Sequence, residues 1–406
     1  MNLHIIGNKA LNKRKYFNVL NKTRKCLAAE GMDDFRKSIA YIERFQCQSQ
    51  ITDTIVLEGF KKWRKPSEEI LSDLKKLVKI DDIPLYIDEN LCIAYSLESL
   101  MTYIAEAIKK ITSQDIIETL WFRGHKEHTY KLIPALYRMK DGKELFYEDK
   151  DLSKVMEPLF KTFQVKVFGA KEIFQSSSDP IIATLATMQH YGVPTNVLDW
   201  STSALTALYF AVEDQMLYSM DTPQNRDKPD KDAALWLLNP SRMNRAREFL
   251  KRGAADRNGI NAMPIPGVYD DNPQFHEYLP LKISSINDKE STPQHPIAVY
   301  VPHVNARIKA QLGTFTLFSL KDEPKAVVTK KDNNGKMYGD LLQMQKFYEE
   351  TAKDEYEPFL TCVRISRKCI NNIADWLRDI GITKPVIYPE LENISRYLTE
   401  EVKRYL

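Results

Sequence analysis

The sequence of 406 residues lacks the features that define several protein classes. No run approaches the roughly 20 consecutive apolar residues that a membrane-spanning helix requires, and the N-terminus has no long apolar segment like that of a signal peptide. The five cysteines are scattered, with no C-x-x-C pair and no histidine at metal-ligand spacing, so neither a disulfide framework nor a zinc site is indicated. We therefore expect a cytoplasmic protein with no membrane segment and no metal centre.

The sequence also lacks a Walker loop, a dinucleotide glycine fingerprint, internal repeats and low-complexity tracts. Its formal net charge of +3 is nearly balanced, so bulk charge does not predict nucleic-acid or membrane binding. What it does have is 43% hydrophobic and 10% aromatic residues, which is ample for real cores. The order of expected helices and strands predicts an α+β protein of two or three domains.

The first 90 residues are lysine-rich, and their pattern favours helices, most clearly over residues 28–45 and 60–79. A break at residues 81–84 places a domain boundary just beyond. We predict an N-terminal helical lobe over residues 1–90, which packs on a main domain of residues 91–406 or contacts a regulatory partner. No catalytic pattern is found in this lobe.

Special residues crowd into residues 189–212. Apolar positions at helical spacing predict a helix over residues 181–188, which Gly192 ends because glycine adopts the left-handed conformation without strain. A second helix, apolar nearly all round, is predicted to begin near Ser201. Its N-terminus would combine Asp199 and several hydroxyls with free N–H groups, an arrangement that binds anions. The alternative is that Asp199 or Ser201 only caps the helix and His190 is a hydrogen-bonded core residue.

A short run of β-branched and aromatic residues over 116–122 predicts a strand that delivers Arg123 at its end. A guanidinium binds phosphate or carboxylate in a forked geometry, although a surface salt bridge is the other common fate of arginine. His125 and His128 are expected in a polar loop. A basic helix over residues 241–252 could contact nucleic-acid phosphates, but it has no interleaved aromatics, so a solvated face is favoured.

Four ordered motifs resemble those of the FRG domain, a bacterial family named for its Phe-Arg-Gly triplet. They are WFRG at 121–124, LIPALYR at 132–138, QHYGVPT at 189–195 and LDWS at 198–201. The likeness extends through Arg307, Gln311 and Gly313 toward residue 400, but it leaves out the first hundred residues. The family name itself conveys no activity.

Within this pattern, the Ser-Thr-Ser of residues 201–203 and the helix after it are similar to a block of ADP-ribosyltransferases of the arginine-serine-glutamate class. The resemblance implies an ADP-ribosyltransferase-like split β-sheet core with flanking helices, and NAD as the substrate. Arg123 matches the arginine in order and setting. The glutamate is missing, because Gln311 is followed by Gly313 where the family has an acid. The implied nucleotide contacts are Arg123, Gly124, Tyr191, Thr195, Ser201 and Ser203, and the implied catalytic residues are His190, Asp199 and Gln311.

The missing acid matters because cleavage of the nicotinamide glycosidic bond builds positive charge on the ribose, which a carboxylate stabilises. Asp199, Glu213 and Glu323 are the candidate substitutes. His190 could act as a general base, since its ordinary pKa lies near neutrality.

Three classes of function follow from these patterns. The first is transfer of ADP-ribose from NAD to a macromolecule, either nucleic acid or protein, in a toxin or phage-defence (antiviral) setting that the bacterial family suggests. The second is a non-catalytic nucleotide-binding or sensing module, and the third is a nuclease or other hydrolase that uses His190 and Asp199. The first reading requires Arg123, His190, Asp199 and Ser201 to converge on one cleft, because groups that orient one ligand must lie within reach of it.

Overall fold

The structure is a computed structural model that describes residues 3–7, 39–47, 50–58, 85–88, 93–113, 118–138, 152–167, 180–216, 229–252, 295–301, 305–318, 320 and 340–402. The chain divides into two compact units, residues 1–103 and 104–406, and each is described by itself. No helix within the described ranges has the length and apolar character that crossing a membrane requires.

A four-stranded antiparallel sheet occupies the described part of the first 90 residues, with strand order β2-β3-β1-β4. Its strands are β1 (Leu3–Gly7), β2 (Ile39–Cys47), β3 (Gln50–Glu58) and β4 (Leu85–Asp88). The predicted helix over residues 28–45 is therefore wrong for residues 39–45, which belong to β2. β2 pairs with β3 along its whole length, from Ile39↔Glu58 to Cys47↔Gln50. The sequences of both strands contain β-branched residues, which favour a strand over a helix. The helix expected over residues 60–79 lies outside the described residues.

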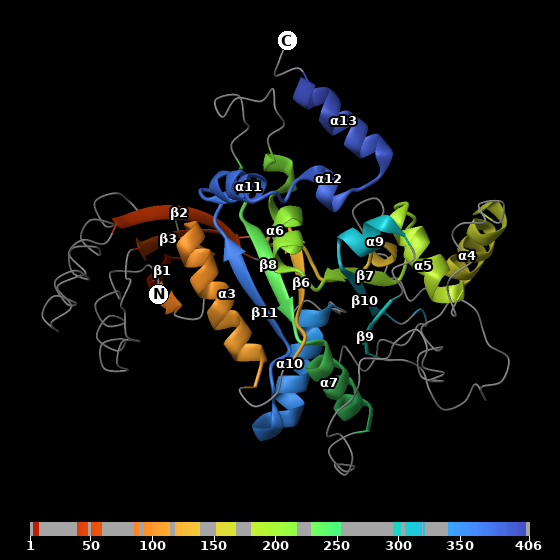
Figure 1. Cartoon of the computed structure of the whole chain (residues 1–406). Coiled ribbons are helices and arrows are strands. Elements are labelled where there is room, and N and C mark those ends of the chain that lie inside the picture. Colours follow the sequence, from red (N-terminus) through yellow and green to blue (C-terminus); the bar gives the residue numbers. More distant parts are fainter. Residues whose placement is uncertain are drawn as a thin grey trace, which may run out of the picture. The chain divides into compact units, whose positions relative to one another are not determined.

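The second sheet has seven strands in the order β5-β11-β8-β6-β7-β10-β9 (Figure 1). Its strands are β5 (Ile93–Ala94), β6 (Trp121–His125), β7 (Val197–Ser201), β8 (Ala233–Leu238), β9 (Ile297–Val299), β10 (Gly313–Leu317) and β11 (Leu360–Ile365). Every pairing from β11 through to β9 is antiparallel. Together with the helices, this sheet confirms the predicted α+β class.

The longer helices lie on and around this sheet (Figure 1). They are α3 (Leu97–Ile111), α4 (Ser153–Val167), α5 (Pro180–His190), α6 (Ala204–Val212), α7 (Pro240–Arg252), α10 (Leu341–Ala352), α11 (Ile370–Asp379) and α13 (Leu391–Val402). Short helical segments are η2 (Ala135–Tyr137), η5 (Glu213–Gln215), α9 (Ala306–Ala310), η7 (Lys353–Glu355) and α12 (Lys384–Ile387). α6 packs on β6, β7 and β8, and α11 packs on α6.

The C-terminal end of α5 follows the sequence prediction. Gly192 has φ of +74°, its N–H donates to the carbonyl of Gln189, and the N–H of Val193 donates to the carbonyl of Met188. These two bonds form a Schellman motif, which satisfies the last carbonyls of a helix and turns the chain sharply. The chain therefore leaves α5 in the direction of β7.

The segment after this turn differs from the prediction, because Asp199 and Ser201 lie on strand β7 and not on a helix N-terminus. α6 begins only at Ala204, and Ser203 is its N-cap, accepting a hydrogen bond from the N–H of Thr206. Four of the five residues of Val197–Ser201 are buried, and pairing with β10 stabilises the segment as a strand. Local sequence alone does not reveal such pairing.

Strands β6 and β7 share a single ladder pair, Phe122↔Ser201, although each is five residues long. β6 is otherwise paired with β8 on its other side, from Trp121↔Leu238 to His125↔Ala234. β7 is paired throughout with β10. The sheet is therefore weakly joined between β6 and β7, because Phe122 and Ser201 are the one ladder pair between these two strands.

Gly124 lies against α6 in the middle of β6. A Cβ at this position would lie 1.9 Å from the carbonyl oxygen of Ala207 and 2.6 Å from the nitrogen of Ala211. Both contacts are with backbone atoms, which cannot move aside as a flexible side chain does. Glycine is therefore required here so that α6 can pack closely on the strand.

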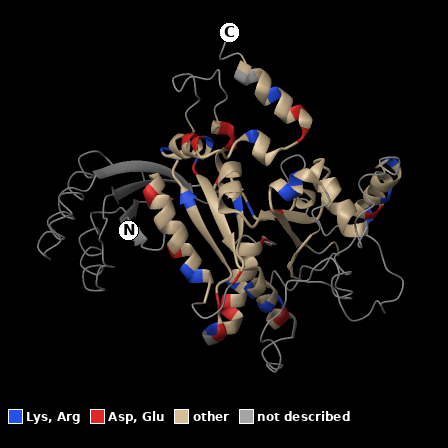
Figure 2. Ribbon diagram, viewed as in Figure 1, with Lys and Arg blue, Asp and Glu red and all other residues tan. Residues whose placement is uncertain are grey.

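Charged residues of both signs are scattered over the outer helices, whereas the strands of the second sheet are mostly uncharged (Figure 2). α7 departs from the solvated helix that was predicted. Arg242 and Arg247 on α7 are buried, paired with Glu118 and Glu248 respectively. Met243, Ala246 and Phe249 belong to the hydrophobic core. The basic pattern of the sequence therefore marks internal ion pairs on α7, because long cationic side chains can be buried where carboxylates meet them.

Candidate functional site

A cleft of about 860 Å³ opens beside the weak junction of β6 and β7. Its lining residues come from β6, the segment after it, α5, β7, α6, α9 and β10, and from Tyr388 near the C-terminal end. The cationic residues among them are Arg123, Lys126, Lys131, Arg138 and Arg307. Asp199 is the one acidic residue in that described lining. The excess of positive charge favours an anionic ligand.

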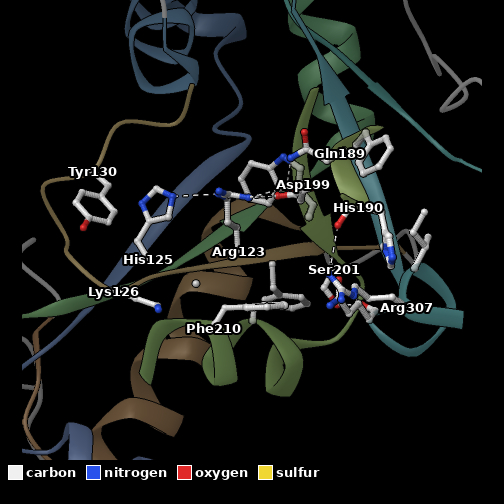
Figure 3. Close-up of a pocket in the computed structure, with 18 of the residues that line it drawn as sticks. Arg123, His125, Lys126, Tyr130, Gln189, His190, Asp199, Ser201, Phe210 and Arg307 are labelled. Carbon is white, nitrogen blue, oxygen red and sulfur yellow. Dashed lines mark hydrogen bonds and ion pairs between the residues drawn. The ribbon is translucent and has the colours of Figure 1, made fainter. Parts of the chain in front are cut away.

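Arg123 extends from β6 into the gap between the two strands. Its Nη1 donates to the main-chain carbonyl of Asp199 at 2.6 Å, and its Nε donates to Nε2 of His125 at 3.0 Å (Figure 3). Burial lowers the pKa of Arg123 to about 10, although nearby Asp199 acts in the opposite direction. At neutral pH the guanidinium is therefore charged. Two of its five N–H groups make these bonds, and the others can serve a ligand.

His125 is buried at the end of β6, not exposed in a loop as predicted. Its Nδ1 faces Nε1 of Trp236 at 3.2 Å while its Nε2 faces Arg123. A neutral imidazole has only one accepting nitrogen. The bond from Arg123 is charge-assisted and therefore the stronger of the two contacts, so Nε2 is the accepting nitrogen. Burial and the positive charges of Arg123 and Arg138 lower the pKa of His125 to about 2. His125 is thus a neutral acceptor that holds a cation. His128 lies in a turn, as expected.

Asp199 presents its carboxylate to the cleft with its side chain 47% exposed. Its Oδ2 accepts a hydrogen bond from Nε2 of Gln189 at 2.7 Å. The Oε1 of the same glutamine accepts from the hydroxyl of Thr195 at 2.5 Å, and Thr195 is fully buried. The distance from Nη1 of Arg123 to Oδ2 of Asp199 is 3.9 Å. The carboxylate therefore lies near the guanidinium without a direct hydrogen bond to it.

Ser201 lines the cleft at the single pair between β6 and β7. Its hydroxyl donates to the carbonyl of Gln311 at 2.7 Å and accepts from the N–H of Ser203 at 3.0 Å. Gln311, which ends α9, donates from Nε2 to the carbonyl of Ile387 at 3.2 Å. These polar groups fix the wall of the cleft, because the bonds from Ser201 to Gln311 and from Gln311 to Ile387 join segments that are distant in the sequence.

At another part of the cleft, Arg307 on α9 contacts the segment between α12 and α13. Its Nε donates to Oε1 of Glu390 at 2.5 Å, and its guanidinium lies 5.0 Å from the centre of the Tyr388 ring. The Tyr388 hydroxyl donates to Glu213 at 2.8 Å. The C-terminal segment is therefore tied to the cleft wall by an ion pair, a cation–π contact and a hydrogen bond.

His190 is the last residue of α5 and lines the same part of the cleft. Its Nε2 is 3.7 Å from Oε1 of Glu390, and its carbonyl accepts from Arg307. Burial and the charge of Arg307 lower the pKa of His190, while Glu390 acts in the opposite direction. The imidazole is therefore neutral at pH 7 and is able to accept a proton.

The expected convergence of Arg123, His190, Asp199 and Ser201 on one cleft is confirmed. Gly124 and Gln311 line this cleft as well. Of the other residues proposed from the sequence, Thr195 is fully buried behind Gln189, Ser203 caps α6, and Tyr191 is 66% exposed; none of the three lines the cleft. The roles of all these residues stay predictions.

Sequence reasoning missed several residues of the cleft, chiefly His125, Lys126, Gln189, Phe210 and Tyr388. Gln189 could have been predicted from the sequence, because it is the first residue of the motif that contains His190. Of the two substitute acids still to be placed, Glu213 accepts from Tyr388 and lies 3.4 Å from Lys126. Glu323 lies outside the described residues.

Residues 118–219 match the model of the FRG domain family, so the chain contains an FRG domain. This range includes β6, α5, β7 and α6, which carry Arg123, Gln189, Asp199 and Ser201. The cleft residues Arg307, Gln311 and Tyr388 lie beyond it. Neither the curated proteins nor the solved structures include a match to this chain.

Proposed function

We propose that the cleft binds NAD and that the protein transfers ADP-ribose from it to a macromolecule. The observation that carries the proposal is the position of Arg123, which projects from β6 into the gap beside β7, with Asp199 and Ser201 on the neighbouring strand. An arginine and a serine on adjacent strands, followed by an apolar helix, match the arrangement that the arginine-serine-glutamate resemblance implies. We also propose that the seven-stranded sheet corresponds to the split β-sheet core of these enzymes.

The size, charge and aromatic lining of the cleft support a dinucleotide. Its volume of about 860 Å³ lies within the roughly 300–1,000 Å³ of ordinary ligand pockets. The cationic residues suit a pyrophosphate, which arginine binds in a forked geometry. Aromatic side chains at Phe122, Tyr130, Phe210 and Tyr388 offer surfaces on which rings can stack.

In this proposal Asp199 takes the part of the missing glutamate, because it is the carboxylate in the described lining of the cleft. Transfer breaks the bond between the ribose carbon and nicotinamide, which leaves with the bonding electrons while a nucleophile of the acceptor bonds to that carbon. Asp199 would stabilise the positive charge on the ribose. Neutral His190 would accept the proton that the nucleophile loses.

A non-catalytic nucleotide-binding module is the second candidate, and one observation favours it. Gly313 occupies the position of the family glutamate, and the amide of Gln311 donates to Ile387, not into the cleft. Such a pocket could retain the nucleotide without the chemistry. The hydrolase alternative has no comparable support, since the imidazole of His190 faces Glu390 while the Asp199 carboxylate accepts from Gln189.

The test combines a binding measurement with a transfer assay. NAD at a hundredfold excess over its dissociation constant should stabilise the protein by about 2.7 kcal/mol, which raises the melting temperature by several degrees. Incubation with labelled NAD and a cell lysate should then move label onto protein or nucleic acid, and digestion with protease or nuclease identifies which.

Asp199→Asn should lower the rate of transfer by about a hundredfold or more, because it removes charge that acts on the transition state. Asp375→Asn is the matched control, since Asp375 pairs with Arg378 on α11 and lies outside the cleft. Binding without transfer would support the nucleotide-binding module. Absence of any NAD binding would reject both candidates.

A further inference from the structure

The charges of Arg123 and Asp199 face one another in the cleft at ion-pair distance and yet do not close into a hydrogen bond. A charge-assisted N–H···O bond has a length of about 2.8 Å, whereas Nη1 of Arg123 lies 3.9 Å from Oδ2 of Asp199. Two opposite charges in a partly buried site attract one another strongly. Something must therefore hold the two side chains apart.

Arg123 is held on its own side by two acceptors that carry no net charge. His125 accepts from its Nε at 3.0 Å, and the main-chain carbonyl of Asp199 accepts from its Nη1 at 2.6 Å. Both acceptors belong to strands of the sheet, so the guanidinium is fixed relative to the β6–β7 junction. Its position does not depend on the Asp199 carboxylate.

The Asp199 carboxylate is held by Gln189, whose Nε2 donates to Oδ2 at 2.7 Å (Figure 3). A carboxylate only accepts hydrogen bonds, so it faces the NH₂ group of the amide. The hydroxyl of Thr195 donates to Oε1 of Gln189 at 2.5 Å and so fixes the other end of the amide. Thr195 is fully buried, where such a bond is costly to lose.

We infer that Thr195 and Gln189 are positioning residues that hold the Asp199 carboxylate away from Arg123, so that both charges stay available to a ligand in the cleft. Neither residue needs to touch the ligand for this effect. The spacing of the three residues follows from the fold: Gln189 is in the last turn of α5, Thr195 follows the turn at Gly192, and Asp199 is central in β7. The inference rests on the proposed function only for the identity of that ligand.

The first experiment needs no ligand and therefore stands apart from the proposed function. The side-chain amide protons of Gln189, assigned by their loss in Gln189→Met, should be shifted downfield in the ¹⁵N-edited spectrum by the bond to Asp199. Thr195→Val should move this signal, and Thr195→Ser should retain it because serine keeps the hydroxyl donor. Thr187→Val is the matched control. Thr187 is buried like Thr195, but it lies on α5 and its hydroxyl donates to the carbonyl of Ala183 within the helix.

The second experiment measures the effect on the cleft, with inorganic pyrophosphate as the probe. Thr195→Val should weaken pyrophosphate binding about tenfold, since a freed carboxylate closes onto Arg123 and occupies its donors. In an Asp199→Asn background the same substitution should have little effect, because asparagine carries no charge to close the pair. A coupling of this kind distinguishes positioning from a general loss of stability.

Two results would overturn the inference. One is an unchanged Gln189 amide signal in Thr195→Val. The other is an equal loss of pyrophosphate affinity from Thr195→Val in the native and Asp199→Asn backgrounds, which would assign Thr195 to the general stability of the turn. A protein that shows the amide response but transfers no ADP-ribose would retain the inference while the proposed function fails.

Discussion

Two arginines line the same cleft, and their surroundings differ in kind. Arg123 is partly buried on a strand, its two hydrogen-bond acceptors are a neutral histidine and a main-chain carbonyl, and the carboxylate oxygen of Asp199 is 3.9 Å away. Arg307 lies on the short helix α9 with its Nε 2.5 Å from the carboxylate of Glu390 and its guanidinium over Tyr388. The positive charge of Arg123 is therefore incompletely compensated, whereas that of Arg307 is neutralised within the protein.

This difference separates two uses of the same side chain. A partly uncompensated, buried cation is costly to maintain unless a ligand supplies the opposite charge, so Arg123 is suited to binding. Burial alone would raise the pKa of Glu390, but the bonds from Arg307 and Asn393 help to lower it below the usual value. Glu390 thus stays ionised beside Arg307, and the pair anchors the C-terminal segment to the wall of the cleft.

The largest expected effect comes from removing each arginine in turn. Arg123→Gln should weaken NAD binding by about a hundredfold, because a desolvated charge-assisted contact is lost. Arg307→Gln should weaken it by about fivefold or less, since the charge of Arg307 is already paired and partly exposed. Isothermal titration calorimetry on both variants measures the difference. Equal losses would show that the cleft does not distinguish the two arginines, and thermal unfolding checks that each variant is folded.

The neutrality of His125, on which the state of Arg123 depends, predicts a pH effect of intermediate size. The pKa of His125 is about 2 in the folded protein and about 6.5 in an unfolded chain. Between these values the unfolded state binds a proton that the folded state does not, so stability falls as the pH falls through this window. Near pH 5, His125→Asn should reduce the slope of unfolding free energy against pH by about 1.4 kcal/mol per pH unit.

Chemical denaturation of both proteins at pH 4.5, 5.0 and 5.5 measures that slope. Other buried histidines contribute equally to both proteins, among them His295, whose pKa burial and Arg247 lower to about 4. At pH 8 the imidazole of His125 is neutral in both the folded and the unfolded state. The unfolding free energies of the two proteins at that pH therefore serve as the reference. Parallel slopes in the acid range would show that His125 can take up a proton in the folded state.

The smallest effect comes from removing the carboxylate charge that faces Arg307. Glu390→Gln should lower stability by at most about 1 kcal/mol, because both partners are partly exposed and screened by solvent. It should also strengthen pyrophosphate binding about threefold at low salt, and salt should abolish the gain. Glu392→Gln is the matched control, since it breaks the exposed pair with Arg396 on α13. No gain over this control would place Arg307 out of reach of an anion in the cleft.

The local sequence was sufficient for elements whose signals lie within a few residues. The end of α5 at Gly192 was predicted, because a left-handed glycine carries its meaning locally. The motif that spans Gln189 and Asp199 likewise identified the region of the cleft. Its residues were found together because α5 and β7 are adjacent in sequence.

Other features depended on partners far along the chain. β7 was taken for part of a helix entry, and it is a strand because Asp199 pairs with Phe315 of β10. His125 was assigned to a loop, and it is buried because Trp236 of β8 and Arg123 meet its two nitrogens. The arginines of α7 were taken for a solvated face, and Arg242 is buried because Glu118 reaches it. In each case at least one deciding contact comes from a residue more than a hundred positions away.

The α+β class and the motifs that contain Arg123, His190, Asp199 and Ser201 follow from the order of residues, since residue type and spacing are local properties. How far the charge of each cleft arginine is compensated follows from the fold. Arg123 and Arg307 are the same residue in the sequence, and they differ because a neutral imidazole faces one while a carboxylate faces the other. Electrostatic state depends on what the fold brings within a few ångströms, and the order of residues along the chain does not specify that distance.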